Sequence, residues 1–441
     1  MTTLEKLKKY LKEIAKNDKH GKKINAILEL KSEKDLITKA KEIDAKIKNN
    51  KAGKLAGMII LVKANINVLG LHASCGSKVL EDYESTYNAS VIDEIEKEDG
   101  LILGMANMDE FAQGSSGETS AFGPTRNPIN TDLITGGTSS GCAAAVKANF
   151  CDIALGSDTG GSCRNPASHC GVIGIKPSYA SVSRHGLIDS AMSFDQIGIL
   201  AKNIRDAGLL LSTIYKKDNQ DSISQETKKI NIDNINKIPK NIKIGLLDFE
   251  INNKSIQEII NNKVKELSEK YKWEVIKIKI PNLDLAVATY YPIQYVEFFS
   301  TTRRLDGRRY GKKIEEFCGP EVLRRILGGS EITKAEHKGR HYHLALKVRK
   351  LLQNEFEKIF KKVDCIISPT VPRLPHKIGE KISVQDMYGY DALTIPANLV
   401  GNCAVSIPVG DINGIPVGMQ IACDRFNDEL MLRIGSGIEK A

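Results

Sequence analysis

A single lysine interrupts the apolar run MIILVKANINV, which has the composition of a short buried strand. In such a strand Lys63 would lose most of its hydration, and desolvation disfavours the ammonium form and lowers the pKa. A lysine whose pKa is lowered in this way can act as a general base. The structural alternative is a lysine at a strand end whose charged head reaches water.

Two glycines precede a serine in the segment GSDTGGSCRNP, where the apolar run CDIAL leads into Gly160, Gly161 and Ser162. Consecutive glycines let backbone N–H groups approach a small reacting atom without obstruction by side chains. Such a loop can polarise a carbonyl group and hold its oxyanion. The segment therefore indicates Ser162 as a nucleophile, with a tight turn as the structural alternative. A phosphate-binding P-loop is disfavoured because no Gly-Lys-Ser/Thr follows.

A second Gly/Ser loop, GGTSSGCAAAV, opens into an Ala-rich segment typical of a helix. Residues 137–141 match the GxSxG nucleophile elbow, which would make Ser139 the nucleophile of an α/β-hydrolase. That motif needs a strong strand directly before it. The preceding NPINTDLIT is a weak strand with Pro128 close by, so Ser139 is the less favoured candidate.

The elements around these loops predict an α/β fold. From residue 100 to 174, short apolar runs alternate with Gly/Ser/Thr-rich loops, which is typical of a sheet covered by helices on both faces. We expect one domain, residues 1–441. Its parts are two amphipathic N-terminal helices in 1–50, a catalytic core in 57–210, a polar surface connector in 216–242, and the remaining strands with the substrate-binding residues in 243–441.

Composition limits the kind of protein this is. The chain has 441 residues, 41% of them hydrophobic, and no apolar run approaches the roughly 18 residues that a membrane span needs. The mixed-charge N-terminus has no secretory or transit pattern, so we expect a cytoplasmic protein. The net charge of +9 is spread along the chain, as in a lysine-biased surface, although it would also favour approach to a polyanion.

Cysteine usage predicts free thiols rather than a disulfide framework or a metal site. Nine cysteines are present, without a CxxC pair. Cys163, His169 and Cys170 are close in sequence but lack a second ligand pair at the spacing of a zinc site. We therefore expect no metal in this chain.

Together, Lys63, GGTSSG and GSDTGGSCRNP resemble the signature of the amidase signature family. The resemblance implies a single domain with a large twisted mixed β-sheet between helices. It also implies a triad of lysine, a serine on a cis peptide, and a nucleophilic serine. In the family the cis serine lies 24 positions before the nucleophile, so the triad maps onto Lys63, Thr138 and Ser162. Backbone N–H groups around residues 159–161 (Thr159, Gly160 and Gly161) would form the oxyanion hole.

Within the family, the runs NMDEFAQGSSGETSAFGPTRNP, LDGRRYG and LTIPANLVG resemble the A subunits of tRNA-dependent amidotransferases. These subunits hydrolyse glutamine and pass ammonia to a B subunit. The resemblance implies that the B subunit uses ATP and Mg to activate Glu-tRNA(Gln), or Asp-tRNA(Asn), and binds most of the tRNA. A small C subunit would hold the two together. No cofactor is implied in this chain itself.

The resemblance also extends to substrate contacts. An arginine in an RRI segment, here Arg325, would hold the α-carboxylate of glutamine, and an aspartate before TIPxNL, here Asp391, the α-ammonium. A tyrosine about twenty residues before the RYG segment points to Tyr290. A free amino acid needs one fixed cation and one fixed anion to be held at its charged end.

Three departures from the family pattern leave alternatives open. Thr138 replaces the serine, Ala64 replaces an aspartate that usually follows the lysine, and Ser140 and Cys142 replace a glycine and a serine. A threonine hydroxyl can donate and accept a proton as a serine hydroxyl does. The alternatives are a stand-alone amidase and a catalytically impaired scaffold subunit.

Overall fold

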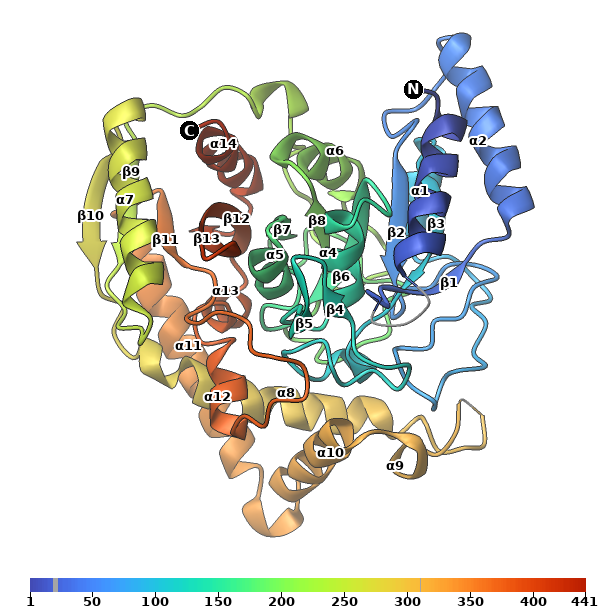
Figure 1. Cartoon of the computed structure of the whole chain (residues 1–441). Helices are drawn as coiled ribbons and strands as arrows, with labels where there is room; N and C mark the ends of the chain where they lie inside the picture. Colours follow the sequence, from blue (N-terminus) through green and yellow to red (C-terminus); the bar gives the residue numbers. More distant parts are fainter. Residues whose placement is uncertain (19–22, 310) are drawn as a thin grey trace.

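The sequence folds around one mixed sheet of 11 strands, in the order β1-β3-β2-β6-β8-β7-β12-β13-β11-β9-β10 (Figure 1). The computed structural model describes residues 1–18, 23–309 and 311–441. The strands of this sheet are β1 (Ile27–Leu30), β2 (Ile59–Lys63), β3 (Leu101–Ala106), β6 (Ile153–Asp158), β7 (Ile173–Lys176), β8 (Gln196–Ala201), β9 (Lys243–Leu247), β10 (Glu274–Ile278), β11 (Cys365–Pro369), β12 (Cys403–Ile412) and β13 (Ile415–Cys423). A separate antiparallel pair joins β4 (Arg126–Asn127) to β5 (Asn130–Ile134).

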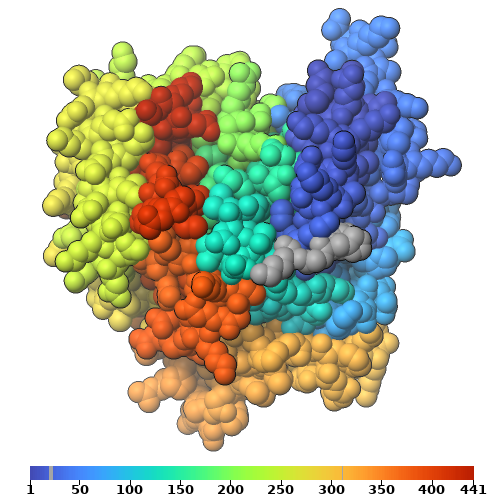
Figure 2. All heavy atoms as spheres, in the orientation of Figure 1, coloured from blue at the N-terminus to red at the C-terminus, as the bar shows by residue number. Residues whose placement is uncertain are grey.

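Parallel and antiparallel pairs occur in separate blocks along the sheet. Strands β3, β2 and β6 are parallel, as are β11, β9 and β10, whereas every pair from β6 through to β11 is antiparallel. The hairpin of β12 and β13 therefore lies inside the sheet, between β7 and β11. Figure 2 shows the same arrangement at the surface, where the red C-terminal residues lie between surfaces in yellow and green from earlier parts of the chain.

Helices cover both faces of the sheet. One hydrophobic cluster packs α1, α2, α4 and α5 on one face, and a second packs α3, α6, α7 and α14 on the other. Helices α8 to α13 lie near the ends of β2 and β6, where Lys63 and Asp158 are found (Figure 1). The bounds are α1 (Thr3–Asn17), α2 (Glu33–Lys48), α3 (Ser90–Lys97), α4 (Ser140–Lys147), α5 (Arg164–Cys170), α6 (Ile204–Ile214), α7 (Lys254–Tyr271), α8 (Ala286–Thr302), α9 (Ile314–Phe317), α10 (Pro320–Ile332), α11 (Arg340–Phe360), α12 (Val384–Gly389), α13 (Ile395–Val400) and α14 (Asp428–Glu439).

The period of two along β2 decides where Lys63 points. Ile60 and Val62 face the cluster that contains α3 and α6, and Ile59 and Leu61 face α4 and α5. Because side chains alternate across a strand, Lys63 lies on the same face as Ile59 and Leu61. Its neighbour β6 runs parallel and ends at Asp158, so both strands deliver their last residues to the same edge of the sheet.

The single α/β domain with a large mixed sheet between helices is confirmed. The two expected N-terminal helices form, as α1 and α2, but the strand β1 lies between them and pairs antiparallel with β3, which the sequence pattern did not predict. The connector 216–242 contains only a short 3-10 turn, Ile232–Asn234. Residues 19–22 of the N-terminal segment and Tyr310 of the LDGRRYG run lie outside the described residues. No helix in the described part of the chain has the length and apolarity that crossing a membrane requires.

Candidate active site

Lys63 ends β2 and is fully buried, with 0% of its surface exposed. Its Nζ donates to Thr138 Oγ1 at 2.7 Å and to Ser157 Oγ at 2.9 Å. The lysine ends a strand, but its head does not reach water. Burial lowers the pKa of Lys63 from its usual value, against a smaller opposing effect of nearby thiols and carboxylates. Burial thus favours the neutral amine, which is the form that a general base needs.

Ser157 provides an acceptor where Ala64 has none. Its hydroxyl accepts from Lys63 and also from Asn65 Nδ2 at 3.1 Å, and all three side chains are buried. Ser157 lies one residue before the end of β6, which pairs with β2. The strand pairing therefore places a polar partner beside Lys63 without the aspartate that the family pattern has after the lysine.

The loop before α4 places Thr138 against the lysine. Gly136 and Gly137 have φ values of 74° and 116°, in the left-handed region that favours glycine. A Cβ atom at Gly136 would lie 2.0 Å from His169 Nδ1, so the loop packs directly on α5. No cis peptide occurs among the described residues, which corrects the expectation from the resemblance at Thr138.

Ser139 connects the two loops through its backbone. Its N–H donates to Ser162 O at 3.1 Å, so the loop that carries Thr138 lies against the loop that carries Ser162. The Ser139 hydroxyl donates to Ser157 O at 3.0 Å. Of the two hydroxyls, Thr138 contacts the lysine and Ser139 contacts a backbone carbonyl. This geometry favours Thr138 as the relay and disfavours Ser139 as a nucleophile.

Ser162 lies between β6 and α5 in a tightly packed loop. Gly161 has φ of 144°, and a Cβ there would lie 2.3 Å from Thr394 Oγ1. A Cβ at Gly160 would lie 2.9 Å from Tyr290 Oη. Only glycine fits both positions, which keeps the backbone of residues 159–161 close to any group bound beside Ser162. Ser162 itself is only partly buried, unlike its neighbours.

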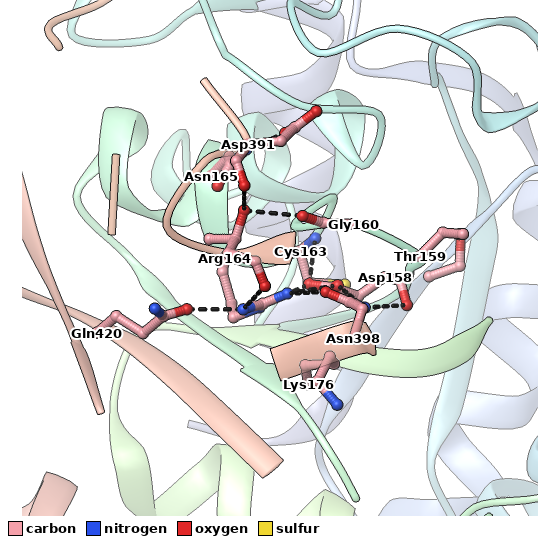
Figure 3. A network of polar contacts seen from close by, with 12 residues as sticks. Asp158, Thr159, Gly160, Cys163, Arg164, Asn165, Lys176, Asp391, Asn398 and Gln420 are labelled. Carbon is pink, nitrogen blue, oxygen red and sulfur yellow. Dashed lines mark hydrogen bonds and ion pairs between the residues drawn. The ribbon is translucent and has the colours of Figure 1, made fainter. Parts of the chain in front are cut away.

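A buried ion pair fixes the shape of this loop (Figure 3). Asp158 accepts from Arg164 Nη2 at 2.9 Å, from Arg164 Nε at 3.0 Å, and from the Cys163 N–H at 3.1 Å. Arg164 also donates to Gln420 and Asn398, each at 2.6 Å. Burial alone would raise the pKa of Asp158, but the guanidinium lowers it to about 2. The pair therefore connects the end of β6 to α5, α13 and β13.

Thr159 is held from the opposite side. Its hydroxyl donates to Asp195 Oδ1 at 2.6 Å, and Asp195 Oδ2 accepts from the N–H groups of Ser190 and Ala191 at 2.8 and 2.9 Å. Burial raises the pKa of Asp195 to about 7. These contacts orient the first residue of the predicted oxyanion hole.

Asp391 lies next to the nucleophile loop. Its Oδ1 accepts from Asn165 Nδ2 at 2.6 Å (Figure 3) and its Oδ2 from Ser115 Oγ at 2.7 Å. Asn165 follows Ser162 by three residues at the start of α5. Burial raises the pKa of Asp391 to about 7. The carboxyl group is thus fixed in place before any ligand binds.

Arg325 and Tyr290 reach the same region from α10 and α8. Arg325 is 3% exposed and donates to Glu321 Oε1 at 2.7 Å and to Gln294 Oε1 at 3.2 Å. Its guanidinium lies 5.4 Å from the ring centroid of Tyr291, whose hydroxyl donates to Asp391 at 3.3 Å. Tyr291 therefore contacts both predicted substrate-binding groups, Arg325 through its ring and Asp391 through its hydroxyl.

The structure brings the nine predicted site residues into one region, and it adds others that the sequence pattern did not identify. The family resemblance indicates Tyr290 and not its neighbour Tyr291, although both are buried and the two rings pack edge to face with centroids 5.2 Å apart. Asp158 and Arg164, on either side of the Gly-Gly-Ser motif, are opposite charges six residues apart, and that spacing was the available signal. The catalytic and binding roles stay predictions.

Comparison with known proteins places the chain among amidases. The amidase family model matches residues 5–432. The A subunit of the glutamyl-tRNA(Gln) amidotransferase of Methanocaldococcus jannaschii is 53% identical over 443 residues, which cover 99% of both chains. The protein of the same name from Methanothermobacter thermautotrophicus is 48% identical over 436 residues, covering 98% of this chain and 94% of its own.

Solved structures agree with the sequence matches. The A subunit of the glutamyl-tRNA(Gln) amidotransferase of Thermotoga maritima superposes with a TM-score of 0.84 at 35% identity, covering 100% of this chain and 94% of its own. A bacterial aryl acylamidase of the amidase signature family superposes with a TM-score of 0.87 at 23% identity, covering 100% and 93%. The second match shows the shared fold alone.

Proposed function

The chain belongs to the amidase signature family, and we propose that it is the glutamine-hydrolysing A subunit of a tRNA-dependent amidotransferase. The observation that carries the proposal is the buried contact of 2.7 Å between Lys63 Nζ and Thr138 Oγ1, beside the loop of Ser162. The relatives at 53% and 48% identity over almost the whole chain support this assignment.

The proposed reaction is nucleophilic catalysis through an acyl-enzyme. Neutral Lys63 takes up the proton of Ser162 through the Thr138 hydroxyl while Ser162 Oγ attacks the side-chain carboxamide of glutamine. Backbone N–H groups of residues 159–161 stabilise the oxyanion. The proton returns through the same relay to the leaving nitrogen, ammonia departs, and a γ-glutamyl ester forms on Ser162. Water attacks this ester and passes a proton to the relay. The relay then returns that proton to Ser162 Oγ as the ester bond breaks, which releases glutamate and restores neutral Lys63.

Substrate selection rests on the two buried charges. Arg325 would bind the α-carboxylate, Asp391 the α-ammonium, and Tyr290 would line the site beside Gly160. Asp391 and Arg325 are both connected to Tyr291, which keeps them at a fixed separation. A stand-alone amidase that acts on uncharged amides has no need of such a pair, and a non-catalytic scaffold has no need of a buried lysine.

The proposed partners follow from the assigned role in the amidotransferase. Ammonia would pass to a B-type subunit that binds the tRNA and activates Glu-tRNA(Gln), or Asp-tRNA(Asn), with ATP and Mg. A small C-type subunit would complete the complex. This chain would need no cofactor of its own and would work in the cytoplasm, where aminoacyl-tRNA is used.

The test is amide formation on glutamyl-tRNA by the complex reconstituted with its B and C subunits, fed either glutamine or ammonium. Ser162→Ala should abolish the glutamine-dependent reaction and leave the ammonium-dependent reaction intact, because ammonium bypasses this subunit's chemistry. Ser139→Ala is the matched control and should keep measurable activity with glutamine. Full glutamine-dependent activity in Ser162→Ala would overturn the proposal.

A further inference from the structure

A continuous chain of buried polar groups connects Arg325 to the Ser162 loop. Gln294, which accepts from Arg325, donates through Nε2 to Gln113 Oε1 at 2.7 Å. Gln113 Nε2 in turn donates to Ser190 Oγ at 2.8 Å. The N–H of Ser190 donates to the Asp195 carboxylate.

The last contact of this chain is the hydrogen bond from Thr159 Oγ1 to Asp195 at 2.6 Å. Every member is nearly inaccessible to water: Arg325, Ser190 and Thr159 are each 3% exposed, Asp195 2%, Gln294 1% and Gln113 0%. Polar groups that are buried this deeply depend on one another for their hydrogen bonds, so moving one moves the next.

Gln113 is the central member of this chain, and its amide uses both its donor and its acceptor groups. Its oxygen accepts from Gln294, and its nitrogen donates to Ser190 Oγ and to Phe111 O at 3.0 Å. An amide can accept and donate at the same time, whereas a carboxylate only accepts and an aliphatic side chain does neither. Neither a glutamate nor a leucine at this position could make all three contacts.

The backbone that carries Gln113 is held in an unusual conformation. Phe111 and Ala112 have φ of 50° and 56°, in the left-handed region that costs free energy for any residue with a Cβ. Hydrogen bonds from Phe111 N to Cys75 O at 2.8 Å and from Ala112 N to Asp109 O at 3.0 Å maintain it. Such strain persists where the surroundings require one geometry, and it is concentrated at functional sites.

The same segment also reaches the other end of the substrate site. Two residues after Gln113, the Ser115 hydroxyl donates to Asp391 at 2.7 Å. Residues 113–115 therefore contact both predicted substrate clamps, one through Gln294 and one directly. The Asp195 end of the chain contacts the predicted oxyanion hole.

We propose that Gln113 and Gln294 are positioning residues that transmit occupancy of Arg325 by the substrate carboxylate to the backbone of Thr159 in the oxyanion hole. The inference rests on the proposed glutaminase function and deepens it. A carboxylate on Arg325 would align the guanidinium, and the chain of amides would then hold Thr159 in the reactive geometry. Selectivity for an α-amino acid would thus be expressed in kcat as well as in KM. Binding energy from a remote part of a substrate is used in this way when truncated substrates lose kcat.

The test compares glutamine with 4-aminobutanamide, which is glutamine without its α-carboxylate, in the reconstituted complex. In the parent, kcat should fall by about 100-fold when the carboxylate is removed, the size of loss that follows from a misplaced oxyanion donor. In Gln113→Leu, kcat with glutamine should fall to near the value for 4-aminobutanamide, while kcat with 4-aminobutanamide should change by less than about twofold. Ammonium-dependent amidation should be unchanged.

Gln294→Glu is the second variant, in case Gln113→Leu does not fold. It keeps an acceptor for Arg325 but loses the donor to Gln113, so it should reproduce the loss of kcat with glutamine. Gln353→Leu, at a half-buried position on α11, is the control and should behave as the parent does.

Two results would overturn the inference. Equal loss of kcat with both substrates would mean a purely structural role, and a parent kcat that does not depend on the carboxylate would mean that nothing is transmitted. The proposed function is tested separately: it fails if the parent complex does not hydrolyse glutamine, or if Ser162→Ala keeps full glutamine-dependent activity.

Discussion

The hydroxyl of Thr138 is the residue-scale feature on which the proposed chemistry depends. It is the contact of Lys63 at 2.7 Å, and its loop lies against the Ser162 loop through the Ser139 N–H. The methyl group that distinguishes threonine from serine is accommodated at a position that is 1% exposed. The departure from the family pattern therefore leaves the hydroxyl in place.

Thr138→Val removes the hydroxyl and keeps the shape. We expect kcat for glutamine hydrolysis to fall by about 10²–10⁴-fold, the usual contribution of acid–base assistance. Thr138→Ser is the control, since it restores the hydroxyl, and should retain activity. The measurement is steady-state glutaminase activity in the complex. A valine variant as active as the parent would mean that the proton passes through Ser139 or water.

How much of the site could be predicted differs from residue to residue. Lys63 and Ser162 stand out because a lysine in an apolar run and a serine after two glycines are unusual in themselves. Gln113, Gln294 and Asp195 do not, because a glutamine or aspartate looks the same in sequence whether it is exposed or buried. Their positions depend on contacts between residues that are far apart in the chain, which no local pattern encodes.

At the scale of elements, α10 is oriented by a buried carboxylate. Glu110 is 1% exposed and accepts from the Gly319 N–H at 2.6 Å and from Ser77 Oγ at 2.5 Å. Gly319 is the residue directly before the helix that carries Arg325. A negative group at a helix N-terminus is favoured by the helix dipole. The NMDEF run thus has a structural role: it connects α10 to the strained segment before Gln113.

Glu110→Ala should loosen the start of α10. It leaves the Gly319 N–H and the Ser77 hydroxyl without their partner, which should lower the free energy of unfolding by about 1–3 kcal/mol. KM for glutamine should rise because Arg325 is displaced, while ammonium-dependent amidation should be unchanged. Urea denaturation and glutaminase kinetics provide the measurements.

The same helix offers a matched control. Glu331→Ala removes an exposed glutamate near the C-terminal end of α10, where the ion pair with Lys334 is at the surface. Surface pairs contribute little, so stability and KM should stay near the parent values. Equal effects of the two substitutions would contradict the role given to Glu110.

Helical periodicity predicted the two long N-terminal helices, but not the short strand between them. The helix α7 and the strands β9 and β10 follow a clear pattern of apolar residues in the sequence. The strand β1, of four residues, was missed because its backbone pairing with β3 stabilises it more than its own composition does. Strand order was equally inaccessible, since it is set by pairing across hundreds of residues.

At the scale of the whole molecule, the buried Lys63 makes stability depend on pH. Its pKa is lower in the folded chain than the ordinary value of 10.5. Between these two values the unfolded chain binds a proton that the folded chain does not, so the free energy of unfolding rises with pH through that window. Below the folded-state pKa, Lys63 is protonated in both states, and the folded protein carries the full free-energy cost of burying a charged ammonium group.

Lys63→Met should therefore abolish glutaminase activity and raise the free energy of unfolding at pH 7 by about 0.5–2 kcal/mol. Such a gain is expected where a residue required for activity destabilises the folded state. The gain should shrink as the pH approaches 10.5, because the parent then unfolds to a neutral lysine as well. Lys41→Met, at an exposed position on α2, is the control and should show no such gain. Denaturation curves at neutral and alkaline pH decide the matter, and a less stable Lys63→Met at both would contradict this account.

The position of the β12–β13 hairpin inside the sheet has a consequence for synthesis on the ribosome. Strands β7 and β11 are made earlier, but each must leave one edge unpaired until residues 403–423 have emerged from the exit tunnel. Unpaired strand edges are templates for pairing with other chains. A nascent chain of this protein thus exposes the unpaired edges of β7 and β11 late in translation. A truncated chain that ends before Cys403 would keep both edges unpaired.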